Sequence, residues 1–578
     1  MGTKLTHLAG LIAIAVAVSG CTDTASEHAA IDAGVSPDAA QAPDARSAPD
    51  ATSVPDALAT TTDAPPPPIP DASTAISLIL EDVTVATNTA TALDGRRTYD
   101  PVNRTLTYAW TVRSAPAGSV AAVHDAGKAL ASFTPDRDGG YVIALTVSAG
   151  SDSTTATMTL TAANLAPQFA VAPTPVTYTG TPIDVTAIAT DANGDSLSYR
   201  WSVKGHPEGS SATVSSLSGT VHFVADVDGP YVLEVIASDG RADSAPFDIA
   251  VTSYHPIAPL AHRIIDAEAS KSLARIVIVD ELPATLYLYD PVADTEVTVA
   301  LPQTPTSVSV SLDGHFAAVG HDGNVSYVDL VNARLVKVYP VTLPVLDVVL
   351  GGNGYIYAFP ARDQWAALHI IDLQTGYESE TSGNFLYAGT VGKLHPDGNR
   401  IYAADNGLSP ESLFDYDITS ATSPTSRLWP YWGDHSPCGD LWFTEDGARI
   451  VTRCGETFRA TGDAKTDMTY SGTLAGLSQY SILQVGHSKA AGKLLVVRGS
   501  DGIFGDATLD EEVWLYGDQY LELDKRQSLG GFVVNGRGFP AHGRFVFADP
   551  DGAHYHVFLE ADPSSALLQD YAVATYSL

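Results

Sequence analysis

The sequence has few cysteines, little positive charge and no common catalytic motif. Its three cysteines, Cys21, Cys438 and Cys454, lack the two closely spaced ligand pairs of a zinc site. Only 31 Lys and Arg residues stand against 67 Asp and Glu residues, so binding to nucleic acid or to an anionic membrane surface is disfavoured. No nucleophile motif, phosphate-binding loop or metal signature is present, so the sequence names no reaction.

The sequence also lacks a hydrophobic run long enough to cross a membrane. The N-terminal run from Leu8 to Val18 has about half the required length and follows Lys4, which predicts a signal peptide over residues 1–20. It ends in VSGC, which resembles the bacterial lipobox, and this resemblance implies that Cys21 becomes the lipidated N-terminus. Thr22 rather than Asp follows, which favours sorting to the outer membrane, so we expect a lipid-anchored cell-envelope protein, periplasmic or surface-exposed. The alternative is an ordinary cleaved signal followed by an incidental cysteine.

Aromatic residues are absent from Thr22 to Ser73. This segment consists mainly of Ala, Asp, Pro, Ser and Thr. Such a composition cannot bury enough apolar surface to offset the loss of chain entropy on folding. We therefore predict a disordered acidic tether over residues 21–75, which serves as a spacer.

Two segments then repeat each other at a spacing of about 90 residues. LTYAW at Leu106–Trp110 matches LSYRW at Leu197–Trp201, and Tyr141 and Tyr231 each follow a turn into an alternating strand, as in a sandwich with a tyrosine corner. The segments resemble PKD-type immunoglobulin-like domains. The resemblance implies two β-sandwiches, over residues 76–163 and 164–254, that act as spacers or weak adhesion modules.

The second of these segments contains a candidate calcium loop. Asp191, Asn193 and Asp195 place three oxygen ligands within five residues, as at the start of a calcium-binding loop. The alternative is a turn whose Asx side chains accept hydrogen bonds from backbone N–H groups. Calcium is the one candidate cofactor.

Residues 255–578 repeat a β-hairpin pattern at a spacing of roughly 40 to 50 residues, the period of a four-stranded propeller blade. The seven predicted turns are centred near Ser272, Asp313, Asn353, Gly398, Asp446, Ala491 and His542. Segments such as PDGNRIYAA and EDGARIVTR resemble the YVTN and WD-like propeller superfamily, which spans scaffolds, lactonases and dehydrogenases. The last blade is predicted to have four strands of its own, so ring closure requires no strand exchanged between the termini. The predicted fold class is all-β: a disordered tether, two tandem Ig-like β-sandwiches and a seven-bladed β-propeller.

The remaining two cysteines flank the predicted hairpin LWFTEDGARIVT. With the turn at Glu445–Gly447, Trp442 lies opposite Ile450 and Cys438 lies opposite Cys454, at a cross-strand spacing that suits a disulfide. Because the expected compartment is oxidising, we predict that these two cysteines are bonded.

One face of the propeller is the expected functional face. In propellers the loops between blades, and the loops between the second and third strands of a blade, usually carry function. The candidate ligand-binding residues on these loops are Trp365, Trp429, Tyr431, Trp432, Asp434 and His435. Aromatic rings beside carboxylates suit sugars or cationic partners, whereas the alternative is that Trp429 and Trp432 pack between blades.

These features predict a lipid-anchored binding or adhesion protein. We expect its propeller to be presented on an Ig-like stalk to a carbohydrate, protein or peptide at the cell surface, with the membrane contacted through the lipid anchor. Two alternatives stay open: a cation-dependent propeller hydrolase of lactonase type, and a non-catalytic envelope scaffold.

Overall fold

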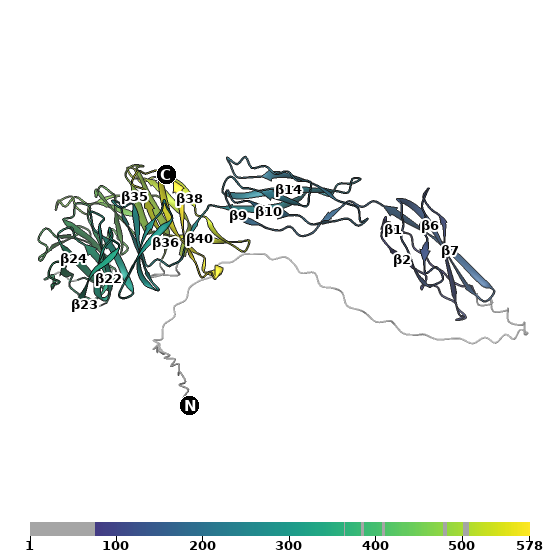
Figure 1. Ribbon diagram of the computed structural model, residues 1–578, viewed down its shortest axis with the longest axis horizontal. Coiled ribbons are helices and arrows are strands. Elements are labelled where there is room, and N and C mark those ends of the chain that lie inside the picture. Colours follow the sequence, from purple (N-terminus) through teal and green to yellow (C-terminus); the bar gives the residue numbers. More distant parts are fainter. Residues whose placement is uncertain (1–74, 363, 383–385, 407–410, 478–481, 501–507) are drawn as a thin grey trace, which may run out of the picture. The chain divides into compact units, whose positions relative to one another are not determined.

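The computed structural model describes residues 75–362, 364–382, 386–406, 411–477, 482–500 and 508–578 (Figure 1). Apart from one short 3-10 turn, η1 (Pro563–Ser565), the regular structure of these residues is β-strand, which confirms the predicted all-β fold class. In these ranges no helix has the length and apolar character needed to span a membrane. The predicted tether and the predicted lipidation site at Cys21 lie outside the described residues.

The first β-sandwich consists of a four-stranded sheet, ordered β1-β7-β6-β3, and a three-stranded sheet, ordered β2-β5-β4. Strand β1 runs parallel to β7, and the other paired strands are antiparallel. The strands are β1 (Val83–Ala86), β2 (Thr91–Asp94), β3 (Thr107–Ser114), β4 (Val123–His124), β5 (Leu130–Phe133), β6 (Gly139–Ala149) and β7 (Asp152–Ala163).

The second β-sandwich repeats this plan with a sheet ordered β12-β14-β15-β9 and two short strand pairs, β10-β13 and β11-β8. The strands are β8 (Gln168–Phe169), β9 (Val176–Tyr178), β10 (Ile183–Thr186), β11 (Ala189–Thr190), β12 (Ser198–Gly205), β13 (Thr220–Phe223), β14 (Gly229–Ser238) and β15 (Phe247–Tyr254).

Equivalent residues hold the cores of the two sandwiches. Trp110 and Trp201 are buried, and each indole N–H donates to a backbone carbonyl. The Tyr141 hydroxyl accepts a hydrogen bond from the backbone N–H of Arg137, four residues upstream, and Tyr231 repeats this bond with Val227. These bonds confirm the predicted tyrosine corners.

Seven blades, numbered in chain order, form the propeller. The strands of blades 1 to 3 are β17 (Asp266–Ser270), β18 (Arg275–Glu281), β19 (Ala284–Asp290), β20 (Thr295–Ala300), β21 (Pro305–Val310), β22 (Phe316–Asp329), β23 (Arg334–Leu350), β24 (Tyr355–Pro360), β25 (His369–Asp372) and β26 (Glu378–Glu380). The long strand β22 supplies two strands of blade 2, and β23 runs from the last strand of blade 2 into the first strand of blade 3.

Blades 4 to 6 are three separate four-stranded antiparallel sheets. Their strands are β27 (Val391–Leu394), β28 (Arg400–Ala404), β29 (Leu413–Asp417), β30 (Thr425–Leu428), β31 (Leu441–Phe443), β32 (Arg449–Thr452), β33 (Glu456–Arg459), β34 (Tyr470–Thr473), β35 (Ile482–Ser488), β36 (Lys493–Ser500), β37 (Thr508–Gly517) and β38 (Leu523–Ser528). Turns follow the first strand of each of the first six blades at the predicted positions.

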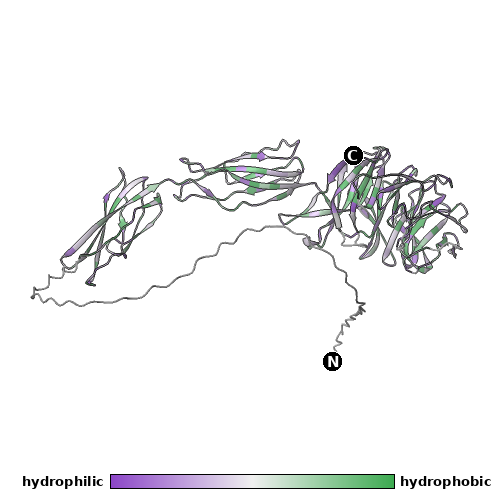
Figure 2. Cartoon of the chain, turned by 180° about the vertical axis from the view of Figure 1, so that it is seen from behind, coloured by the Kyte–Doolittle hydropathy of each residue, from purple (hydrophilic) through white to green (hydrophobic). Residues whose placement is uncertain are grey.

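Apolar side chains that alternate along the strands pack between the blades. Val277 and Leu286 of blade 1, for example, share one core cluster with Val308 and Ala317 of blade 2. Figure 2 shows that hydrophobic residues concentrate on the strands. A single hairpin is only marginally stable in water, so this packing between sheets is what makes the ring stable.

Blade 7 closes the ring by exchanging a strand between distant parts of the chain. Its strands are β40 (Arg537–Ala548), β41 (His554–Ala561), β42 (Tyr571–Ser577) and β16 (Ala258–Leu260). Strand β16 pairs antiparallel with β42, so that Ala258 lies opposite Val573. The prediction that the last blade has four strands of its own was therefore wrong.

The error in blade 7 has a clear local cause. His542 lies within β40, opposite Glu560, and not in the predicted turn. The preceding strand β39 (Gly531–Val534) forms an extra hairpin with the start of β40 around Asn535 and Gly536. Strand β40 continues from Arg537 to Ala548 with only a register irregularity between Gly543 and Phe545, so the two strands predicted on either side of His542 are one strand.

Carboxylates on the inner strands join neighbouring blades. Asp266 Oδ2 accepts a hydrogen bond from Val308 N at 2.8 Å, between blades 1 and 2. Asp347 Oδ2 accepts one from Gly392 N at 2.9 Å, between blades 3 and 4. The first strand of a blade is a sheet edge with unpaired N–H groups, and these side chains satisfy such groups without adding another strand.

Candidate functional site

The loop between β30 and β31 carries most of the predicted ligand-binding residues. Trp432 is 80% exposed at its tip, and Asp434 is also exposed. The Trp432 ring is therefore accessible to solvent and makes little packing contact with the blades. The alternative that Trp432 packs between blades therefore does not describe this structure.

The other aromatic residues of this loop pack against the neighbouring blade. Trp429 is only 4% exposed and lies 5.5 Å from the Phe458 ring, so it packs in the core as the alternative interpretation expected. The Tyr431 hydroxyl accepts a hydrogen bond from Tyr470 N at 2.8 Å. His435 stacks on the Tyr470 ring at 4.7 Å, so these residues fix the loop that presents Trp432.

His435 also ties the loop to the next blade. Its Nδ1 lies 2.9 Å from Glu456 Oε1, and the other oxygen of Glu456 accepts a hydrogen bond from Ser436 N. His435 therefore contacts the Glu456 carboxylate and the Tyr470 ring, and both contacts hold the loop in place.

A disulfide between Cys438 and Cys454 closes the base of the loop, with the two Cα atoms 5.5 Å apart. The predicted pairing of the cysteines is confirmed, but the register behind that prediction was wrong by one residue, because Trp442 pairs with Val451 and not with Ile450. Cys438 lies before β31 at a positive φ of 58°, so it is not part of the regular ladder.

Trp365 lies on a different blade, in the connection between β24 and β25. It is 60% exposed, and its ring centroid lies 4.7 Å from that of Tyr387. Its part in ligand binding stays a prediction, as does that of the residues in the Trp432 loop.

The predicted calcium loop is a turn with internal hydrogen bonds. Asp191 Oδ1 accepts bonds from the backbone N–H groups of Asn193 and Asp195. The Asn193 side chain is buried; its Nδ2 donates to carbonyls, and its Oδ1 accepts a bond from Leu165 N at 2.8 Å. These are the contacts of the alternative interpretation, and calcium binding at this turn stays a prediction.

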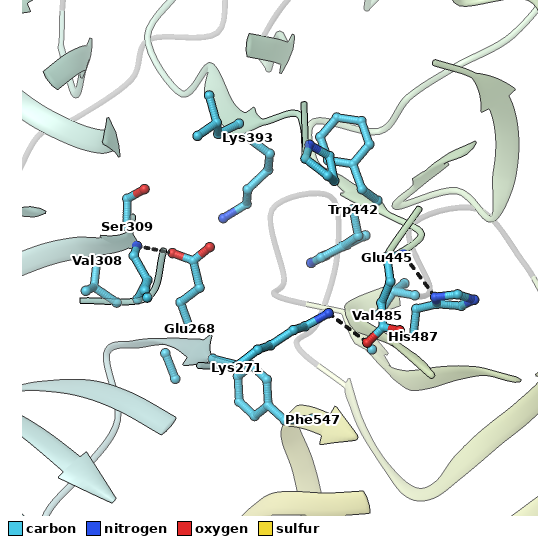
Figure 3. Close-up of a pocket in the computed structure, with 18 of the residues that line it drawn as sticks. Glu268, Lys271, Val308, Ser309, Lys393, Trp442, Glu445, Val485, His487 and Phe547 are labelled. Carbon is cyan, nitrogen blue, oxygen red and sulfur yellow. Dashed lines mark hydrogen bonds and ion pairs between the residues drawn. The ribbon is translucent and has the colours of Figure 1, made fainter. Parts of the chain in front are cut away.

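The propeller encloses a central cavity of about 420 Å³ that none of the predicted ligand residues lines (Figure 3). Its walls come from the first strands of the blades, and its mouth from the turns after those strands. Lys393 on β27 extends into it, facing Glu268 on β17 (Figure 3). The cavity therefore lies toward the turns that follow the first strands, and not toward the loops that were predicted to carry function.

Four carboxylates surround Lys393. Burial raises the pKa of Asp266 and of Asp440 to about 6 and that of Glu268 to about 7, and it also raises the pKa of Asp347. Burial alone would lower the pKa of Lys393, but the carboxylates outweigh this effect and raise it. The lysine is thus a permanent cation among acids that are partly protonated near neutral pH.

Most of the carboxylate oxygens in this group are already hydrogen-bonded to the backbone. Asp266 accepts bonds from Ala267 N and Val308 N, and Glu268 Oε2 accepts one from Val310 N at 2.6 Å. In the part of the chain that the structure describes, no group of three or more His, Cys, Asp or Glu residues is arranged to hold a metal ion.

The sequence contains a weak signal for this cavity. Asp266 starts the first strand of blade 1, and Asp440 directly precedes that of blade 5, each followed by an apolar residue. A carboxylate at the same place in several repeats marks the inner wall of the ring. The prediction favoured the loops instead, because loops usually carry function.

Comparisons with known proteins agree with this architecture. Residues 80–162 match a family model of the PKD domain. No curated protein matches the sequence.

Three solved structures similar to this chain each cover more than half of it. Hydrazine synthase from Kuenenia stuttgartiensis is 16% identical with a TM-score of 0.39, over 55% of this chain and 95% of that chain. A quinonprotein alcohol dehydrogenase-like protein from Bacteroides thetaiotaomicron is 13% identical with a TM-score of 0.36, over 63% and 96%. The WD40 repeats of RRP9 are 11% identical with a TM-score of 0.37, over 56% and 100%. At these identities and scores, no activity carries over to this chain.

Proposed function

We propose that this chain is a lipid-anchored cell-envelope binding protein that presents its propeller to a carbohydrate, protein or peptide. The observation that supports this function best is the exposed indole of Trp432, on a loop held by a disulfide and by the His435–Glu456 pair. Binding sites need few but rigidly placed aromatic side chains, because such side chains lose little entropy on binding. The two sandwiches serve as the stalk.

A glycan array and a pull-down from envelope extracts, both with the full chain, test this function. We expect a partner whose binding is lost in Trp432→Ala and weakened in Asp434→Ala. Tyr520→Ala is the matched control, since Tyr520 is also largely exposed but lies in the turn between β37 and β38. Binding that survives in Trp432→Ala, or is lost equally in the control, contradicts the proposal.

The anchor is a separate part of the proposal and rests on the VSGC sequence at Cys21. Its test is metabolic labelling with a fatty acid. Labelling of the wild-type chain and its loss in Cys21→Ser are expected. Fractionation of the two proteins then tests outer-membrane attachment, and a Cys21→Ser chain that fractionates with the membrane as the wild type does would exclude the anchor.

A further inference from the structure

The central cavity holds an ammonium and a carboxylate that face each other without direct contact. Neither Lys393 Nζ nor Glu268 Oε1 makes a hydrogen bond or ion pair with any described residue, and Figure 3 shows no interaction between the two side chains. Protein atoms surround Lys393 elsewhere, so solvent reaches it through the cavity. Polar groups inside proteins are seldom left without partners, so water bonds both groups unless a ligand in the cavity takes its place.

A hydroxyl group has the chemistry to occupy this position. It accepts a hydrogen bond from an ammonium while it donates one to a carboxylate. A carboxylate or phosphate could bond Lys393 but would meet the surrounding acids, and an added cation could bond Glu268 but would meet Lys393. A neutral ligand with several hydroxyl groups satisfies both residues and adds no charge.

The rest of the cavity suits the carbon skeleton of such a ligand. Trp442 and Phe547 provide aromatic wall, and the Trp442 indole N–H is already bonded to Gln484 at 2.9 Å. Aromatic surface of this kind packs against the C–H faces of a sugar ring. The volume of about 420 Å³ lies within the range of about 300–1,000 Å³ that is usual for small-molecule sites.

We propose that the central cavity binds a mono- or disaccharide whose hydroxyl groups bridge Lys393 and Glu268. This inference rests on the proposed function for its ligand class, and it adds an internal site to the Trp432 loop. Small sugars enter at the end of the cavity where Lys271 and Glu445 lie, since the turns that form the mouth are there.

Isothermal titration of the full chain tests the site with six sugars: glucose, galactose, mannose, N-acetylglucosamine, cellobiose and maltose. At least one is expected to bind saturably. Glu268→Gln keeps the shape of the side chain but removes its charge, and it should weaken binding by about tenfold or more. Tyr520→Ala is the matched control and should bind the sugar like the wild type, because Tyr520 is exposed and does not line the cavity. Thermal unfolding checks that each variant is folded, and difference density in sugar-soaked crystals gives a second readout that needs no variant.

Three results would overturn the inference: no binding of any of the six sugars, equal binding by Glu268→Gln, or density at the Trp432 loop alone. The two proposals fail separately. Array binding that depends on Trp432, together with no binding of the six sugars, leaves the proposed function and removes the cavity site. Sugar binding that depends on Glu268, without any effect of Trp432→Ala on the array, does the reverse.

Discussion

Lys271 and Glu445 form an ion pair at the mouth of the central cavity, with Lys271 Nζ 2.7 Å from Glu445 Oε1. Lys271 follows the first strand of blade 1 and Glu445 follows that of blade 5, so the pair joins blades that are not neighbours. Glu445 Oε2 also accepts a hydrogen bond from Lys489 N of blade 6 at 2.9 Å. One glutamate therefore links three blades.

Removal of the lysine from this pair should cost little stability. Because more than half of the Lys271 side chain is exposed, Lys271→Met should lower the free energy of unfolding by no more than about 1 kcal/mol. Glu445→Ala should cost more, since Lys489 N also loses its partner. Urea unfolding of the full chain measures both changes. A larger loss of stability in Lys271→Met than in Glu445→Ala would contradict the prediction that the exposed lysine contributes little to this pair.

Glu268 should make the protein less stable as the pH rises toward neutrality. Its pKa is raised from 4.5 to about 7 in the folded protein, mainly by burial, so the folded state holds the proton more tightly. The contribution of the protonated Glu268 to folding stability is fully present below pH 4.5 and is lost as the pH rises through about 7. Glu268→Gln has no charge to bury, so its stability relative to the wild type should increase from pH 5 to pH 8, by on the order of 1–3 kcal/mol.

Thermal unfolding at several pH values measures this difference. The exposed Glu208 provides the control, because Glu208→Gln should follow the wild type at every pH. If the difference in stability between Glu268→Gln and the wild type does not change with pH, burial does not raise the pKa of Glu268.

Closure of the ring can be tested with a crosslink. Ala258 on β16 lies opposite Val573 on β42, and opposed residues of antiparallel strands have Cα distances that a disulfide can span. Ala258→Cys combined with Val573→Cys should form a disulfide in the folded chain, visible as a mobility shift on a non-reducing gel. The thermal unfolding temperature should rise, since the crosslink closes a very long loop. Failure to form the bond in folded protein would argue against strand exchange in blade 7.

The native disulfide should stabilise the propeller. Cys438 and Cys454 are 16 residues apart, and a loop of this size gives about 3 kcal/mol in the chain-entropy model. The double variant Cys438→Ser, Cys454→Ser should lose about 2–3 kcal/mol in chemical unfolding. A reducing agent should lower the wild type to the same level and leave the variant unchanged. An equal effect of the reductant on both proteins would contradict this account.

Sequence reasoning located most of the fold. Turn residues such as Asp397 and Gly398 and the alternation around them predicted the hairpins, because these signals depend on neighbours a few residues away. The same reasoning paired Cys438 with Cys454 but misplaced the register, since Cys438 leaves the extended conformation before β31. It failed at blade 7, where the turn predicted at His542 lies within the continuous strand β40.

The candidate site divides in the same way. The sequence pointed to the loop that bears Trp432, because aromatic and acidic residues occur together there, but it could not tell exposed Trp432 from buried Trp429. The exposure of each ring depends on which residues of other blades pack against it, and Phe458 of the next blade packs against Trp429.

The amino-acid sequence by itself determined most of the strands, the turns of the first six blades and the number of blades, because these follow from short-range backbone preferences and from alternation of side chains. Only the tertiary structure decided that Ala258 closes the ring and that Lys393 and Glu268 face each other across one cavity. Those residues are far apart in the chain and become neighbours when the blades, each unable to bury its own faces, pack into a circle.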